Sequence, residues 1–181
     1  MSVFTRFKKI LTWTIMSTAV LALTVTSIAS GSEDRAFGFK LVKAQQRTKV
    51  LERQLACLAR NVFYEANGEP MAGQMAVAQV TVNRARSGLF PRDLCAVVSQ
   101  STVVGGDTRV CQFSWYCESA TMTRPRNMAA FKESEMVARQ VLLEGFRLPS
   151  LQKALYFHAT HINPKWNREK VAVIAGHVFY K

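Results

Sequence analysis

Acidic residues are scarce in this chain of 181 residues. Asp and Glu together number 12, against 24 Lys and Arg, and the net charge is +12. Such a surplus of positive charge favours an anionic partner: nucleic acid, a membrane surface or an anionic cell-wall polymer. The basic residues are scattered, and no basic run has the interleaved aromatic residues of a nucleic-acid reader, so we do not expect nucleic acid as a partner. A basic surface that is merely solvated accounts for the charge equally well.

Several catalytic and metal-binding patterns are also absent. The chain has no H-E-x-x-H motif, no G-x-S-x-G motif and no C-x-x-C pair with histidines at zinc spacing. His158 and His161 lie in a stretch typical of a strand, where residues at this spacing point to opposite faces. That geometry is poor for joint metal ligation, even if His177 contributed. We therefore expect neither a metal ion nor an organic cofactor.

No Asp or Glu occurs in residues 1–32. Three basic residues precede an uncharged run over residues 10–32, which is just long enough to span a bilayer. Because basic residues before such a run stay in the cytoplasm, we expect the rest of the chain to be exported to the periplasm or cell envelope. Small residues at 27–29 allow cleavage as a signal peptide, whereas an uncleaved run would anchor the protein in the inner membrane. The Thr, Ser and Ala content also resembles the signal-arrest-release segments of some phage endolysins.

The chain has four cysteines, an even number: Cys57, Cys95, Cys111 and Cys117. In an oxidising compartment, two disulfides are the simplest interpretation. Three pairings are possible, and Cys111–Cys117 with Cys57–Cys95 costs least in loop geometry, because the first of these pairs is local. Buried free thiols are the alternative.

Beyond residue 32, a polar tether over residues 33–48 precedes a domain over residues 49–181. Apolar residues recur at three- and four-residue steps over residues 50–67, which predicts an amphipathic helix. A second helix is predicted over residues 70–86, opened by Pro70 and ended by Ser87-Gly88, and another over residues 127–144, which has an apolar face. A shorter helix is expected over residues 92–100. Little periodicity appears at 101–126, so a loop region around Gly105-Gly106-Asp107 is expected there, and two stretches look like strands, residues 154–159 and 171–180. The predicted fold class is α+β, mostly helical with a small β element near the C-terminus.

Two carboxylates, Glu65 and Glu69, flank the glycine that ends the first of these helices, Gly68. A carboxyl group backed by Phe63 and Tyr64 is suited to hold a proton near neutral pH, because a partly apolar pocket disfavours the charged form. Position alone favours a Glu65 that is exposed to water. For Glu69 we expect a cap at the next helix, where the N-terminus stabilises a carboxylate. A role in orienting Glu65 is the alternative.

The segment between the last two cysteines is rich in aromatic residues. Exposed aromatic side chains on a loop closed by a disulfide offer flat surfaces for stacking sugar rings. Gln112 and Ser114 would supply hydrogen bonds to hydroxyl or acetamido groups. Phe113 and Trp115 fit an ordinary core position equally well.

Five short motifs follow one another along the chain: Glu65 to Pro70 (E-A-x-G-E-P), Gly73-Gln74, Ala76 to Val80 (A-V-A-x-V), Asn83-Arg84 and Phe90-Pro91. In this order they resemble the cell-wall hydrolases of the spore cortex-lytic (SleB-like) family, and the resemblance covers residues 55–181. One departure is Asn67, where the family commonly has Arg. That departure affects any contact made by the Arg and leaves the acid in place.

The resemblance implies a lysozyme-like α+β domain that acts on the glycan strands of peptidoglycan, with Glu65 as the catalytic acid. Further stretches also look like the family: the Cys111-Gln-Phe-Ser-Trp run, the Tyr156-Phe-His-Ala strand, the Pro164-Lys-Trp166 turn and the terminal Gly176-His-Val-Phe-Tyr180. Tyr156, His158 and Trp166 thereby join the earlier candidates for substrate-binding or supporting residues, which are Glu69, Gln112, Phe113, Ser114 and Trp115.

The chemistry implied by the resemblance is lytic transglycosylation. The acid protonates the oxygen that bridges N-acetylmuramic acid (MurNAc) and N-acetylglucosamine (GlcNAc), and then takes the proton of the muramoyl 6-hydroxyl as the 1,6-anhydro product closes. A hydrolytic muramidase normally needs a second carboxylate about 5–9.5 Å away. Asp107 and Glu118 are the remaining candidates and match no motif. Two further functions stay open, an N-acetylmuramoyl-L-alanine amidase and a non-catalytic domain that binds peptidoglycan.

Overall fold

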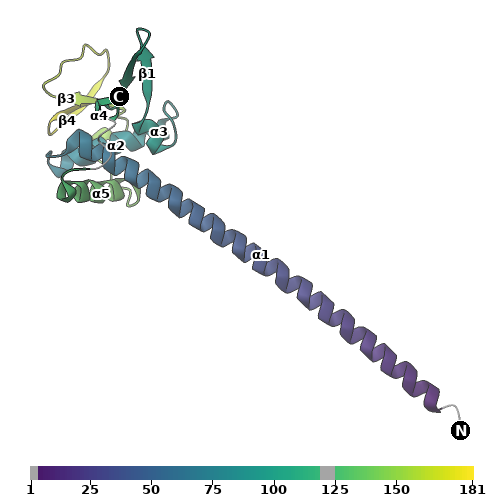
Figure 1. Ribbon diagram of the computed structural model, residues 1–181. Helices are drawn as coiled ribbons and strands as arrows, with labels where there is room; N and C mark the ends of the chain where they lie inside the picture. The colour runs from purple at the N-terminus through teal and green to yellow at the C-terminus, as the bar shows by residue number, and fades with distance from the viewer. Residues whose placement is uncertain (1–3, 119–124) are drawn as a thin grey trace. The chain divides into compact units, whose positions relative to one another are not determined.

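The computed structural model describes the backbone of residues 4–118 and 125–181 and, within these ranges, the side chains from residue 35 onward (Figure 1). The chain divides into two compact units, residues 1–49 and 50–181. Helix α1 (Phe4–Ala66) begins in the first unit and ends in the second, so the residues expected as a tether are helical. The predicted export segment, residues 1–32, lies outside the described side chains. Within the described residues, no helix is long and apolar enough to cross a membrane.

In the second unit, the predicted helices are present with bounds close to those expected. They are α2 (Met71–Ser87), α3 (Leu94–Val98) and α5 (Met128–Leu142). Gly88 ends α2 with a φ of 77°, a left-handed conformation that glycine adopts without strain. Asp93 and Asn127 cap α3 and α5, since their side-chain oxygens accept hydrogen bonds from backbone N–H groups three residues later.

Helix α2 lies at the centre of this unit and is buried over most of its length. On one side, Ala78 and Val82 pack with Leu58 and Val62 of α1 and Val137 of α5. On the other side α2 meets the C-terminal sheet, as the second core cluster shows: Ala76, Val80, Leu151, Ala154 and Phe179. Its small side chains allow neighbours to approach from several directions, which is why this helix lacks a single apolar stripe.

The C-terminal sheet has three antiparallel strands in the order β3-β5-β4. They are β3 (Tyr156–Ala159), β4 (Lys170–Ile174) and β5 (His177–Tyr180). The two predicted strand regions are confirmed, and the second one is a hairpin of β4 and β5 that turns at Ala175 and Gly176. The central strand β5 is the most buried of the three, which places Phe179 in the core.

A second, two-stranded sheet was not predicted. Strands β1 (Ser101–Val104) and β2 (Thr108–Cys111) form an antiparallel hairpin where a loop was expected. Most of its side chains are exposed, so no buried face imposes the alternation of apolar and polar residues that marks a strand. A short helix, α4 (Ser114–Glu118), follows the hairpin, and a 3₁₀ turn, η1 (Pro149–Leu151), precedes β3.

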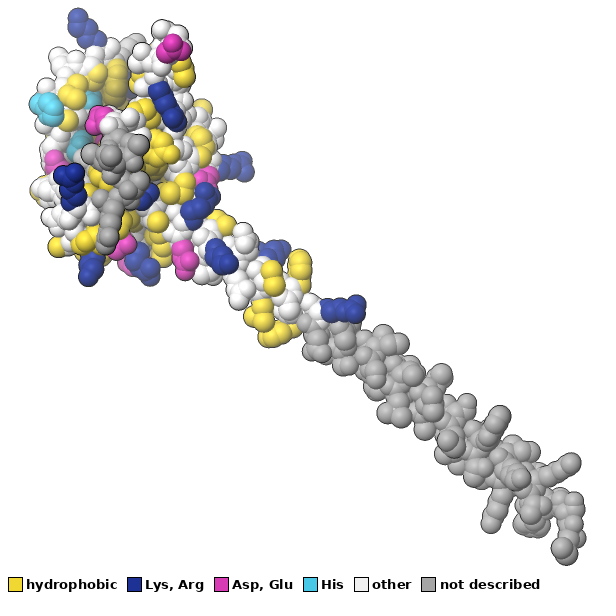
Figure 2. Space-filling model, in the orientation of Figure 1, with side chains coloured by type: hydrophobic (Ala, Val, Ile, Leu, Met, Phe, Trp, Pro, Cys, Tyr) yellow, Lys and Arg dark blue, Asp and Glu magenta, His cyan; other side chains and the backbone are white. Residues whose placement is uncertain are grey.

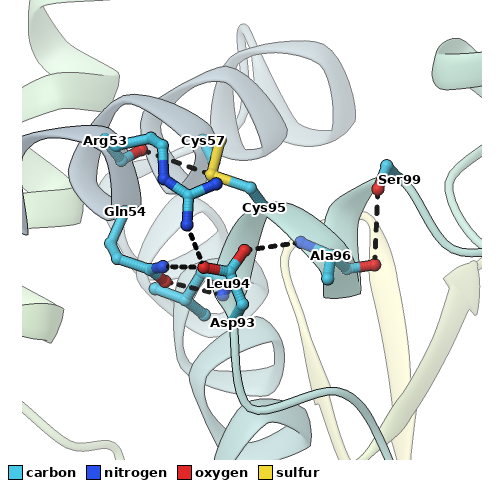
Figure 3. Close-up of polar contacts among 8 residues, drawn as sticks. All are labelled: Arg53, Gln54, Cys57, Asp93, Leu94, Cys95, Ala96 and Ser99. Atoms are coloured by element: carbon cyan, nitrogen blue, oxygen red, sulfur yellow. Dashed lines mark hydrogen bonds and ion pairs between the residues drawn. A yellow bond between two sulfur atoms is a disulfide. The ribbon is translucent and has the colours of Figure 1, made fainter. Parts of the chain in front are cut away.

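The end of α1 is fastened to α3 by a disulfide and by polar contacts (Figure 3). Both expected disulfides are present, Cys57–Cys95 between these helices and Cys111–Cys117 between the end of β2 and α4. Beside the first disulfide, Arg53 and Gln54 of α1 both donate to the Asp93 carboxylate, the N-cap of α3. This junction fixes the helix whose last turn carries Glu65.

Candidate active site

Glu65 lies on the last turn of α1, half-buried at the edge of the core. The chain turns back directly after it: the Glu69 N–H donates to the Ala66 carbonyl (3.0 Å), and Gly68 has a φ of 88°. Glycine is required at this position because a side chain disfavours positive φ. The turn places the acid next to the start of α2.

The environment of Glu65 favours its neutral form. Burial raises the pKa of Glu65 to about 7, the positive charge of Arg84 lowers it, and the negative charge of Glu118 raises it. A carboxyl group with this pKa holds a proton in a large fraction of molecules at neutral pH and can also release it. Glu65 can therefore act as a general acid and, after donating its proton, as a base.

Arg84 of α2 is the cation that faces this acid, and it is buried. Its Nε donates to the Leu155 carbonyl (2.7 Å), and its guanidinium lies 5.0 Å from the ring centroid of Phe113 and 5.1 Å from that of Phe90. Burial lowers the pKa of Arg84 to about 10, so the group stays charged at neutral pH. Among the described residues none accepts a hydrogen bond from its Nη1, which makes this nitrogen a candidate substrate contact.

From the sequence, Arg84 was recognised only as part of a motif, and its place in the site was missed. Asn61 was missed as well; its buried side chain accepts a hydrogen bond from Trp115 Nε1 (3.0 Å) and donates one to Thr81 Oγ1 (3.0 Å). Both residues are polar side chains in predicted helices, and both are buried in the structure. Their polar character was the detectable signal, because a polar group is rarely buried without a partner.

The residues between Cys111 and Cys117 differ in how deeply their side chains are buried. Phe113 and Trp115 are core residues, 2% and 9% exposed, whereas Gln112 and Ser114 are exposed. Trp115 stacks on Tyr64, with ring centroids 4.5 Å apart, and so forms part of the wall beside Glu65. The two buried rings support the site from within, and the two polar side chains are free to meet a ligand.

Glu69 lies directly before Pro70, the N-cap residue of α2, so its position near this cap is as expected, whereas its side-chain hydrogen bond goes to another element. The N-cap position is Pro70, which makes no side-chain cap, and Glu69 Oε2 instead accepts a hydrogen bond from the Gly176 N–H (2.9 Å). Burial lowers the pKa of His177, and the negative charge of Glu69 acts in the opposite direction and raises it. The carboxylate thus links the turn after Glu65 to the β4–β5 hairpin.

Strand β3 brings Tyr156 and His158 to one face of the sheet, since they are two residues apart. His158 Nε2 lies 2.9 Å from the Tyr180 hydroxyl, and Trp166, 42% exposed, packs edge-on against the His158 ring. The Tyr156 ring lies 5.9 Å from the Arg84 guanidinium, which connects this aromatic group to Glu65.

The remaining histidine, His161, is exposed and stands apart from these contacts. Within the described residues, no group of three His, Cys, Asp or Glu side chains is placed to hold a metal ion.

The structure resembles two solved structures. One is the catalytic domain of the germination-specific lytic transglycosylase SleB from Bacillus anthracis, with a TM-score of 0.53 and 27% identity, covering 71% of this chain and 93% of that one. The other is the catalytic domain of SleB from Bacillus cereus, with a TM-score of 0.51 and 25% identity, covering 72% and 91%. These matches confirm the predicted lysozyme-like α+β fold.

The sequence matches point to the same group of proteins. The chain is 29% identical over 126 residues to a spore cortex-lytic enzyme of Bacillus subtilis (strain 168), covering 67% of this chain and 35% of that protein. It is 27% identical over 134 residues to a spore cortex-lytic enzyme of Oceanobacillus iheyensis, covering 72% and 42%. The chain thus spans less than half the length of these relatives. Residues 68–180, well over half of the chain, match the model of the cell wall hydrolase family, and the chain belongs to that family.

Proposed function

We propose that this protein degrades peptidoglycan by cleaving the MurNAc–GlcNAc glycosidic bond as a lytic transglycosylase, with Glu65 as its single acid and base. The observation that carries the proposal is the half-buried carboxyl of Glu65, whose pKa burial raises to about 7 beside the Arg84 guanidinium. The similarity to the catalytic domain of SleB from Bacillus anthracis, a lytic transglycosylase, supports the reaction type.

One carboxyl group is enough for this reaction. Protonated Glu65 donates its proton to the bridging oxygen, and the bond between that oxygen and the muramoyl C1 breaks. The resulting carboxylate then takes the proton of the muramoyl 6-hydroxyl as its oxygen bonds to C1, so Glu65 is protonated again. Arg84 stabilises the carboxylate formed between the two steps, since its charge lowers the pKa of Glu65.

The other candidate carboxylates are poorly suited to act as the second carboxylate of a hydrolytic mechanism. Glu69 is engaged with the Gly176 N–H, and Asp107 lies in the turn of the β1–β2 hairpin. Glu118 lies near enough for its charge to raise the pKa of Glu65, but it is exposed at the end of α4. Direct closure of the anhydro ring needs no activated water, and this favours transglycosylation over hydrolysis.

The decisive experiment replaces the acid and identifies the products. Digestion of purified peptidoglycan followed by mass spectrometry should show muropeptides with 1,6-anhydro ends, and Glu65→Gln should lower their release at least a hundredfold. Asp107→Asn, an exposed carboxylate in the hairpin turn, is the matched control and should stay active.

Each contrary outcome contradicts the proposal in its own way. Reducing ends would show a muramidase, and freed peptides an amidase. Peptidoglycan binding without any product would show a non-catalytic domain, and full activity of Glu65→Gln would remove that residue from the mechanism.

For such a substrate the protein must leave the cytoplasm, and we propose that residues 1–32 direct this export. N-terminal sequencing of the exported protein tests how: a new end near Ser30 shows cleavage of a signal peptide. An intact Met1 on a membrane-bound form shows an anchor, and an intact Met1 on a soluble form shows release.

A further inference from the structure

An open pocket of about 600 Å³ lies where the C-terminal end of α2 meets the segment 147–155. Its volume lies in the range of pockets that hold organic ligands, and it exceeds what a small inorganic ion fills. No Asp or Glu is among the described residues that line it. Six polar or charged side chains do: Asn83, Arg86, Ser87, Arg147, Gln152 and Lys153.

Among the described residues, the three cations of this pocket have no carboxylate as an ion-pair partner. Arg86, Arg147 and Lys153 take part in neither of the ion pairs found in the described part of the chain. Burial lowers the pKa of Arg147, and the positive charge of Arg86 lowers it further, as expected for cations that repel one another. The C-terminus of α2 contributes only about half a negative charge. On the face shown in Figure 2, most Lys and Arg side chains stand singly, several with Asp or Glu close by.

Hydrogen bonds across the fold hold the walls of the pocket in place. Asn83 Nδ2 donates to the carbonyls of Leu151 (2.8 Å) and Ala154 (3.0 Å). One turn earlier on α2, Gln79 exchanges two hydrogen bonds with the backbone of Leu148. Because the α2 wall and the 147–155 wall are already joined, binding of a ligand does not have to order them.

The pocket adjoins the contacts of the proposed acid. Arg84 follows Asn83 on α2, acts on the pKa of Glu65, and donates through Nε to the carbonyl of Leu155, which lines the pocket. In peptidoglycan, a peptide stem branches from the muramoyl residue and carries free carboxylates. We propose that this pocket binds the carboxylates of that peptide stem while the glycan lies at Glu65. The inference rests on the proposed function, since it takes the muramoyl residue to be bound there.

The test compares two double variants that lose the same charge. Arg86→Gln/Lys153→Gln alters the pocket, and Arg92→Gln/Lys132→Gln alters exposed cations outside its lining. Both are made in the full chain with Glu65→Gln to prevent turnover. Titration calorimetry measures binding of soluble muropeptides with free stem carboxylates, of the same muropeptides with amidated carboxylates, and of stem-free glycan.

We expect the pocket variant to bind the free-carboxylate muropeptide about tenfold more weakly, from the loss of two partly exposed ion pairs. The control variant should bind it as the parent does, and binding of the amidated and stem-free probes should not depend on the pocket. Equal losses in both variants would mean attraction by overall charge, and an undiminished affinity would mean no stem contact; either overturns the inference. Equal loss for the stem-free probe overturns it too, because the pocket would then bind glycan.

The same proteins separate this inference from the proposed function. If the enzyme with Glu65 intact releases anhydro products but the pocket variant binds the stem normally, only the pocket inference fails. If the intact enzyme releases no product while the pocket variant loses the free-carboxylate probe, only the proposed function fails.

Discussion

The buried carboxyl group of Glu65 lowers the stability of the fold when it is ionised. Burial raises its pKa from an ordinary 4.5 to about 7, so between these values the folded chain binds more protons than the unfolded chain. The free energy of unfolding therefore falls as the pH rises through this window. We predict that Glu65→Gln raises the free energy of unfolding by about 1–3 kcal/mol at pH 8 and leaves it unchanged at pH 4.

Urea denaturation at the two pH values measures this difference. The exposed Glu135 provides the control, since Glu135→Gln should change stability equally little at both. A gain for Glu65→Gln of the same size at pH 4 and pH 8 would show that packing, and not the buried charge, is responsible.

Glu118 affects the pKa of Glu65 from an exposed position. Its negative charge raises the pKa of Glu65, and its own side chain is exposed, so Glu118→Gln should leave the fold intact. With that charge gone, the pKa of Glu65 falls and the protonated form is lost at a lower pH. We predict that the alkaline limb of the pH–activity profile moves to lower pH while activity at pH 5 is kept. Complete loss of activity at every pH would instead identify Glu118 as a second catalytic carboxylate.

Glu65 could be proposed as the acid from the sequence because this residue, the turn glycine and the motifs that carry the family resemblance are close together in the chain. The role of Arg84 could not, since it depends on Phe113 and Tyr156, which join it only in the folded state. The role of Trp115 could not be predicted from the sequence either. A ring in a short aromatic run fits a core position and a sugar-stacking position equally well, and only its hydrogen bond to Asn61 decides between them.

At the scale of elements, helices and strands that bury one regular apolar face could be predicted from the sequence. Helix α5 and the C-terminal strands have apolar residues at the period of the element, and they are present as expected. The β1–β2 hairpin and the described part of α1 before residue 50 are exposed on nearly all sides. Elements without a buried face impose no periodic pattern, which is why the hairpin was taken for a loop and the helix for a tether.

The Glu69 carboxylate lies against Gly176, where the absence of a Cβ leaves room for it, and so links the turn before α2 to the β4–β5 hairpin. Gly176 does not have a positive φ, so its backbone does not require glycine, but a Cβ there would lie 2.2 Å from Glu69 Oε1. We predict that Gly176→Ala lowers the free energy of unfolding by about 1–3 kcal/mol, because the carboxylate must move and its bond to the Gly176 N–H is lost. Denaturant unfolding measures the loss.

A double-mutant cycle shows whether Glu69 is the cause. In a Glu69→Ala background the clash is gone, so Gly176→Ala should cost much less than in the wild type. An equal cost in both backgrounds would assign the effect to the hairpin alone. Gly38→Ala is a suitable control, since a Cβ at that helical position meets no atom within 4 Å.

At the scale of the whole molecule, the two disulfides hold different parts of the domain together. Cys57–Cys95 closes a separation of 38 residues and joins α1 to α3, whereas Cys111–Cys117 closes one of 6 and joins the end of β2 to α4. A longer loop loses more freedom in the unfolded chain when it is closed. The first disulfide therefore contributes mainly to stability. The second one holds Trp115 and Glu118 near Glu65.

We predict that replacing each pair by alanines separates stability from activity. Loss of Cys57–Cys95 should lower the free energy of unfolding by about 4 kcal/mol and leave the turnover of the folded enzyme nearly unchanged. Loss of Cys111–Cys117 should cost only about 2 kcal/mol but reduce turnover more, because α4 loses its covalent link to β2 and keeps only non-covalent contacts, among them the Trp115 bond to Asn61 and its stacking on Tyr64. Denaturation curves and muropeptide release at 20 °C measure both quantities. If both variants lose stability and turnover in the same ratio, the two disulfides do not have separate roles. Each would then support the same cooperative unit, which would contradict this prediction.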